Sequence, residues 1–194
     1  MFKKTALSVS AFIVIAMAGM ACAQTAPAKE SPKPAQSPSA ETLSAWNDIG
    51  RRLVDMAEDF PEDKYDFKTT PAQRSFAENL LHVASDYCRE ISAIKGSQVG
   101  PAITMDKDFQ RADYKTKADV VKLLKQAVAD GAAVIKDQGD AGLTRENKSP
   151  YDGTMQHVWF AWMGTIEHAG EHYGQLAVYY RVAGMVPPES RPKK

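Results

Sequence analysis

Cysteine is scarce in this chain of 194 residues, which contains only Cys22 and Cys88. A covalently attached c-type haem requires a Cys-x-x-Cys-His sequence, so that class of protein is excluded. If an export signal is removed after Ala23, Cys88 remains alone, and a single thiol cannot form an intramolecular disulfide. The folded part must then be stabilised by its hydrophobic core.

Long apolar runs are absent after the first segment of the chain. No later stretch approaches the ~20 consecutive apolar residues that a membrane-spanning helix needs. At the start, Lys3 and Lys4 precede a mostly apolar run, and Ala21-Cys22-Ala23 has the small-x-small pattern of a cleavage site. We therefore expect a signal peptide over residues 1–23 and a periplasmic or secreted protein. The alternative is a lipoprotein acylated at Cys22.

Neither charge is in excess, since 24 Lys and Arg residues face 24 Asp and Glu residues. Removal of residues 1–23 takes away Lys3 and Lys4 and no acidic residue, which leaves a net charge of about −2. Proteins that bind nucleic acid usually carry a basic face. We therefore expect no nucleic-acid partner and no membrane contact beyond the export signal, and a small-molecule substrate of unknown identity.

Alternating polar and apolar residues, the pattern of strands, are not sustained anywhere. Residues 24–39 are rich in Pro, Ala and Ser, which is typical of an extended linker. Residues 40–192 have the length of one domain. Apolar residues spaced by threes and fours predict four helices, over residues 40–60, 71–95, 116–135 and 154–183. The expected fold class is all-α, a four-helix bundle, in which the long connection 97–115 can cross the bundle.

Helix starts are predicted from capping residues. Thr70, Pro71 and Gln73 fit a capping box at the start of the second helix. Thr116 with Asp119 fits the start of the third helix.

His168 and His172 are the most informative pair in the chain. Residues four apart on a helix differ by about 40° in direction and about 6 Å in height, so both imidazoles can reach one metal ion. A third ligand from a neighbouring helix would leave one coordination position open. The alternative is a pair of partly buried histidines that make ordinary hydrogen bonds.

The two other histidines differ in whether they could bind the same metal ion. His157 precedes His168 by eleven residues, about 16 Å along the helix axis, so it cannot share that ion. His82 lies at the margin of the apolar stripe of the second helix, where periodicity permits a ligand role without requiring one.

Two known metal-site patterns fit less well. A di-iron bundle needs Glu-x-x-His on each of two helices, which this chain lacks. The string His168-x-x-Glu171-His172 matches the inverted zinc-peptidase motif, but only 22 residues follow it and no large α/β fold is predicted there. We interpret that match as coincidental and Glu171 as a solvated helix residue. Trp159, Trp162 and Cys88 are expected in the core.

Three segments of the sequence resemble the DinB-like family. They are Phe60-Pro61-Glu62-Asp63-Lys64-Tyr65-Asp66-Phe67-Lys68, Phe76-Ala77-Glu78-Asn79-Leu80-Leu81-His82-Val83-Ala84, and Glu167-His168-x-x-Glu171-His172-Tyr173-Gly174-Gln175-Leu176 with the following Pro187-Pro188-Glu189-Ser190. The resemblance covers roughly residues 41–191. It implies a four-helix bundle with a long crossover between the second and third helices, and homodimers are common in the family.

The resemblance also implies a divalent metal ion held by His82, His168 and His172. Zinc or nickel is the first expectation, with iron or manganese as alternatives. Characterised relatives include bacillithiol and mycothiol transferases, so the implied activity is that of a metal-dependent hydrolase or thiol transferase, with no catalytic residue assigned. The alternative is a non-catalytic helical bundle that binds a metal or another ligand.

Overall fold

The structure is a computed structural model that describes residues 34–192. The expected signal peptide over residues 1–23 and most of the expected linker lie outside the described residues. The elements are helices α1 (Pro38–Asp59), α2 (Phe76–Lys95), α3 (Lys117–Leu143) and α4 (Val158–Val182), strands β1 (Glu146–Lys148) and β2 (Met155–His157), and two short 3-10 turns, Glu62–Lys64 and Pro188–Ser190. Across the described residues, none of the helices has the length and hydrophobicity required to span a bilayer.

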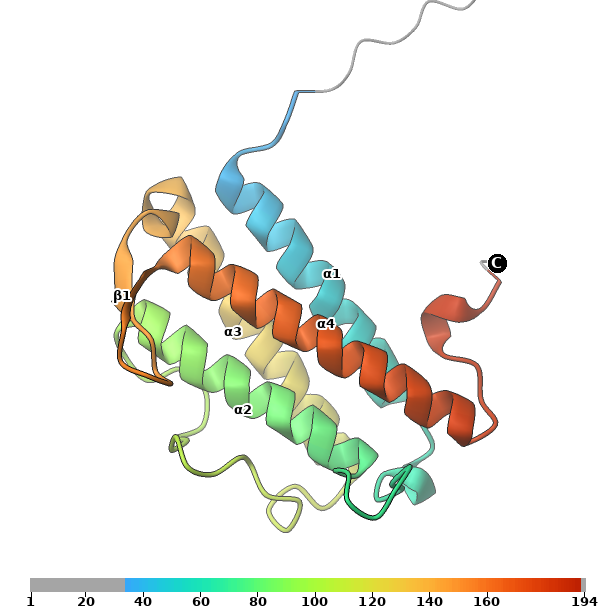
Figure 1. Cartoon of the computed structure of the whole chain (residues 1–194). Coiled ribbons are helices and arrows are strands. Elements are labelled where there is room, and N and C mark those ends of the chain that lie inside the picture. The colour runs from blue at the N-terminus through green and yellow to red at the C-terminus, as the bar shows by residue number, and fades with distance from the viewer. Residues whose placement is uncertain (1–33, 193–194) are drawn as a thin grey trace, which may run out of the picture. The chain divides into compact units, whose positions relative to one another are not determined.

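The four helices form a bundle in which α1 and α4 run in one direction and α2 and α3 run in the other (Figure 1). The end of α1 lies beside the start of α2, where the Phe60 and Phe76 rings stack with centroids 3.9 Å apart. The start of α1 lies beside the end of α3, where Ser39 N donates to Asp140 Oδ1. Because α2 and α3 are parallel, the chain between them must run back along the bundle. The expected bundle of four helices is confirmed, and the described residues also contain one short hairpin.

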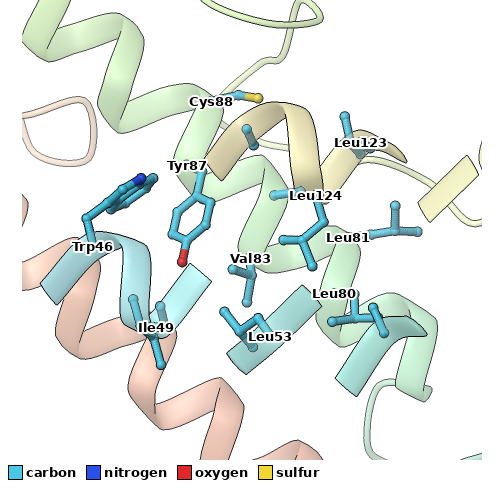
Figure 2. Close-up of a cluster of buried hydrophobic side chains, with 14 of the residues drawn as sticks. Trp46, Ile49, Leu53, Leu80, Leu81, Val83, Tyr87, Cys88, Leu123 and Leu124 are labelled. Atoms are coloured by element: carbon cyan, nitrogen blue, oxygen red, sulfur yellow. The ribbon is translucent and has the colours of Figure 1, made fainter. Parts of the chain in front are cut away.

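The core forms where the four apolar stripes meet, and Figure 2 labels members of it on α1, α2 and α3. The ring centroid of Trp46 on α1 lies 4.4 Å from that of Tyr87 on α2 and 5.2 Å from that of Trp162 on α4. All three side chains are almost fully buried, and Leu53, Leu80 and Leu124 extend the core along the bundle. Large aromatic side chains dominate the apolar area that such a core removes from water, so this aromatic group anchors α1, α2 and α4 to each other.

The predicted start of the second helix was wrong by five residues. Thr70 to Gln73 form a turn, and α2 begins at Phe76 after the N-cap residue Ser75. Glu78 N donates to Ser75 Oγ at 3.2 Å and Ser75 N donates to Glu78 Oε2 at 2.5 Å, a complete capping box. The sequence contains two candidate capping boxes, and the one followed directly by the buried Phe76 forms the helix.

The boundaries of α1 and α4 also differ from the prediction. Helix α1 begins at Pro38 with Ser37 as its N-cap, two residues earlier than expected. Helix α4 begins only at Val158, because residues 155–157 pair with β1 in a two-stranded antiparallel hairpin that the sequence did not predict. Trp159, expected in the core, is about half exposed. With the helix starting after the hairpin, Trp162 points inward and Trp159 lies on the outer side.

Candidate metal centre

Three imidazoles meet between α2 and α4. One ligand nitrogen from each of His82, His168 and His172 lies within 4.8 Å of the others. The ring centroids are 5.2 Å apart for His82 and His168, 4.8 Å for His82 and His172, and 4.6 Å for His168 and His172. The i, i+4 spacing on α4 supplies two of these rings, and the antiparallel packing of α2 against α4 supplies the third. The structure thus brings together all three predicted site residues.

The His82 ring is oriented by the long connection between α2 and α3. His82 Nδ1 lies 2.7 Å from Asp108 Oδ2, and Arg89 Nη1 donates to Asp108 Oδ1 at 3.0 Å. Burial alone would raise the pKa of Asp108, but the hydrogen bonds from His82 and Arg89 hold it below its ordinary value. Asp108 is therefore a carboxylate that can only accept, so Nδ1 of His82 donates to it, and Nε2 is the His82 nitrogen left for a metal ion.

The His172 ring is oriented from α2. Asn79 Nδ2 donates to Ser75 O at 3.0 Å, which fixes its amide so that Oδ1 faces His172 Nδ1 at 3.2 Å. Nδ1 of His172 is then the donor and Nε2 keeps its lone pair. Burial, and next the neighbouring His168 and His82 rings, lower the pKa of His172 to about 3. His172 is therefore neutral, as a metal ligand must be.

His168 presents a nitrogen with no hydrogen-bond partner. Within residues 34–192, His168 Nε2 is buried and makes no hydrogen bond, although Asp86 Oδ2 lies 3.3 Å away. A buried polar atom without a partner is costly unless something else binds it. With one ring nitrogen of His82 and of His172 also available, three imidazole nitrogens converge, and this donor set suits zinc, nickel, copper or iron(II). The residues present therefore fit a divalent metal ion.

A cavity of about 450 Å³ opens directly beside His82 and His168. It lies between α2 and α4, and the β1–β2 hairpin region closes its far side. Its lining is formed by His82, Asp86, Glu90, Tyr151, Gln156, Phe160, Ala161, Gly164, Thr165 and His168. Tyr151 and Phe160 are each about half exposed, so the cavity reaches the surface.

Other residues considered at the sequence level lie apart from the three histidines. His157 is exposed at the start of α4. Glu171 is exposed, and its carboxylate comes no closer than 3.8 Å to His168 Nδ1. Tyr173 lies under the Arg52 guanidinium at 5.9 Å, away from the cavity. Burial raises the pKa of the Cys88 thiol to about 11, so it is a core residue and not a nucleophile.

Sequence reasoning missed the residues that surround the histidines. Asp86 carries a local signal, because it follows His82 by four residues and so shares its face of α2. Asn79 precedes His82 by three residues, which is a similar but weaker sequence signal. Asp108 carries none, since it reaches His82 from a loop 26 residues away in the chain.

Comparison with known proteins agrees with this architecture. A family model described as the DinB superfamily matches residues 45–176. A comparison with curated proteins found no match.

Solved structures share the fold at low sequence identity. A DinB-like protein from Bacillus cereus ATCC 10987 is 17% identical, with a TM-score of 0.65 over 77% of this chain and 95% of that one. A DinB-like protein from Bacillus subtilis is 20% identical, with a TM-score of 0.60 over 79% of this chain and 99% of that one. A conserved protein from Enterococcus faecalis is 14% identical, with a TM-score of 0.53 over 76% and 98%. At such identities the likeness concerns the fold alone.

Proposed function

The chain belongs to the DinB superfamily, and we propose that it binds a divalent metal ion through Nε2 of His82, His168 and His172. The observation that carries this proposal is the convergence of three imidazole nitrogens, one of them buried without a hydrogen-bond partner. Asp108 and Asn79 support the assignment, because ligating histidines usually donate their other ring N–H to a carboxylate or carbonyl.

We further propose that the protein is a metal-dependent hydrolase or thiol transferase. A cation held by three histidines can lower the pKa of water or a thiol placed beside it. The open cavity next to His82 and His168 supports an active site over a purely structural metal, since a reactant needs a route to the ion.

Asp86 is the residue placed to handle a proton in such a reaction. Its Oδ2 lies 3.3 Å from His168 Nε2, and its Oδ1 accepts a hydrogen bond from Tyr151 Oη at 2.6 Å. Oδ2 therefore faces the histidines while Oδ1 is held in place. A carboxylate in that position can accept a proton from water or a thiol that enters the cavity.

Zinc or nickel is the proposed ion, and iron or manganese the alternative. The test is elemental analysis of protein purified without chelators, on the wild type and on the His168→Ala and His157→Ala variants. The proposal expects one metal per chain in the wild type and in His157→Ala, and loss of the metal in His168→Ala. Full occupancy in His168→Ala would refute the site.

Export and assembly are proposals of their own. A periplasmic or secreted location predicts a mature chain that begins at Gln24, which N-terminal sequencing of the fractionated protein checks. A homodimer would have an apolar surface available on α4, where Trp159 and Met163 are each about half exposed. Light scattering at several concentrations decides between monomer and dimer.

A further inference from the structure

The cavity beside the histidines extends away from them along α2. His82, Asp86 and Glu90 follow each other at intervals of four residues and all line it. One helical turn advances about 6 Å, so Asp86 lies about 6 Å and Glu90 about 12 Å from His82 along the helix. The cavity therefore has one end at the histidines, where Asp86 Oδ2 lies 3.3 Å from His168 Nε2, and a second end at Glu90.

The second end is negative and lacks a built-in positive partner. No lysine or arginine is among the described residues that line the cavity. Arg89, the nearest guanidinium along α2, is turned toward the α2–α3 connection. There it donates to Asp108 Oδ1, to Thr104 O and to Lys107 O. Its Nη1 remains 3.9 Å from Asp86 Oδ1, beyond hydrogen-bond distance. The charge of Asp86 is thus partly compensated, and the cavity supplies nothing that compensates Glu90.

Glu90 is the clearest sign that something binds there. The residue is only 3% exposed, and its carboxylate is hydrogen-bonded by two side-chain amides. Gln156 Nε2 donates to Oε1 at 3.1 Å, and Asn147 is the second partner. Both partners are neutral, so they do not compensate the charge of an ionised Glu90. A buried carboxylate is stable only when it is paired or fully hydrogen-bonded. Burial and then the nearby Asp86 carboxylate raise the pKa of Glu90 to about 7, as expected for a carboxylate that lacks a cation.

The opposite wall of the cavity is apolar and belongs to α4. Phe160, Ala161 and Gly164 form it, and a Cβ added at Gly164 would contact nothing. A bare metal ion would leave such a wall unused, whereas a carbon chain would contact it. The size of the cavity, about 450 Å³, also exceeds what one ion would fill.

We infer that this cavity selects organic cations, compounds with a primary ammonium group that lies between Asp86 and Glu90 while their other end reaches the metal. The inference rests on the proposed metal site. It concerns the two carboxylates along α2 and not the three ligand nitrogens, so it can fail while the metal site stands. An ammonium group would donate to the carboxylates of Glu90 and Asp86, and its carbon chain would pack against Phe160 and Gly164.

The test compares three short thiols on the zinc-loaded chain by calorimetric titration. Cysteamine, 2-mercaptoethanol and 3-mercaptopropionate offer the same group to zinc and end in an ammonium, a hydroxyl and a carboxylate. We expect cysteamine to bind at least about tenfold more tightly than 3-mercaptopropionate, the size of effect that one charge-assisted hydrogen bond can give. In Glu90→Gln the preference should fall several-fold, while 2-mercaptoethanol binds as in the wild type. This variant controls for the different thiol acidities of the three probes.

A pair of glycine variants tests whether the probes occupy this cavity. Gly164→Leu fills the apolar wall and should weaken all three thiols without loss of zinc. Gly174→Leu is the matched control, because Gly174 is also on α4 with nothing within 4 Å of its added Cβ, and it does not line the cavity. It should change no affinity.

The possible outcomes separate the two proposals. Equal affinities for the three thiols, preference for the carboxylate, or a preference that survives Glu90→Gln would overturn the cation inference and leave the metal site intact. Retained zinc with no binding of any thiol would also overturn it. Absence of zinc from the wild-type protein would refute the proposed metal site, and the inference with it.

Discussion

His82 Nδ1 on α2 and Asp108 Oδ2 in the α2–α3 connection lie 2.7 Å apart. This contact joins the crossover to the proposed metal site, because Asp108 accepts a hydrogen bond from Nδ1 of His82 and leaves Nε2 as the nitrogen for a metal ion. Arg89 holds the other oxygen of Asp108 and two carbonyls of the same loop. The long connection therefore positions a ligand as well as linking two parallel helices.

Asp108→Asn should weaken metal binding by about tenfold or more, in the range found when partners of ligating histidines are changed. The amide keeps the shape of the side chain but loses the charge that fixes the His82 tautomer. Competition with a chromophoric chelator measures the affinity.

Asp106→Asn is the control, because Asp106 is an exposed aspartate of the same loop. It should bind the metal as the wild type does. Equal losses of metal affinity in the two variants would mean that Asp108 contributes only to the net charge of the loop and does not act through His82.

Ser75→Ala should lower the free energy of unfolding by about 1 kcal/mol, because it removes the cap of α2. Thr70→Ala, at the start predicted from sequence, should change it by less than about 0.5 kcal/mol, as is usual for surface positions. Thr70 is exposed and outside the helix. Urea unfolding of both variants measures the difference, and a larger loss in Thr70→Ala would contradict the observed helix boundary.

Gly131→Ala should destabilise the fold by about 1–3 kcal/mol, the usual cost of overpacking a core. A Cβ at Gly131 of α3 would overlap the indole of Trp46, which cannot move away because its Nε1 donates to Val128 O at 2.8 Å. Gly174→Ala has open space around it and should instead stabilise α4 by up to about 1 kcal/mol. Thermal unfolding distinguishes the expected destabilisation from the expected stabilisation. Stabilisation by both substitutions would show that the Trp46 side chain moves to make room for the new Cβ.

Glu90→Gln should stabilise the metal-free protein increasingly as the pH rises from about 4.5 to about 7. The folded protein keeps the Glu90 proton up to a pKa of about 7, whereas the unfolded chain loses it near the ordinary value of 4.5. The folded state therefore binds more protons in this window, and the wild type loses stability as the pH rises. Above pH 7 the difference should level off. Urea unfolding at a series of pH values measures it, and a constant difference would exclude a raised Glu90 pKa.

The sequence determined the four helices and the pair of site histidines on α4. Most members of the four predicted apolar stripes are buried in the core, among them Trp46, Leu80, Leu124 and Trp162. Met155 and Trp159, predicted in the stripe of the fourth helix, are exposed. The His168 and His172 pair follows from helix geometry alone, because a spacing of four residues fixes the relation of two side chains on one helix. Such relations within one helix do not depend on how the rest of the chain packs.

Tertiary structure decided what surrounds that pair. Residues far apart in the chain met only when α2 packed antiparallel to α4 and when the crossover and hairpin closed around them. Asp108 came to His82 in this way, and Gln156 came to Glu90. The choice of Ser75 over Thr70 as helix cap depended on the burial of Phe76. Contacts of this kind leave no periodic pattern in the sequence, because they depend on how separate helices and loops pack around one core.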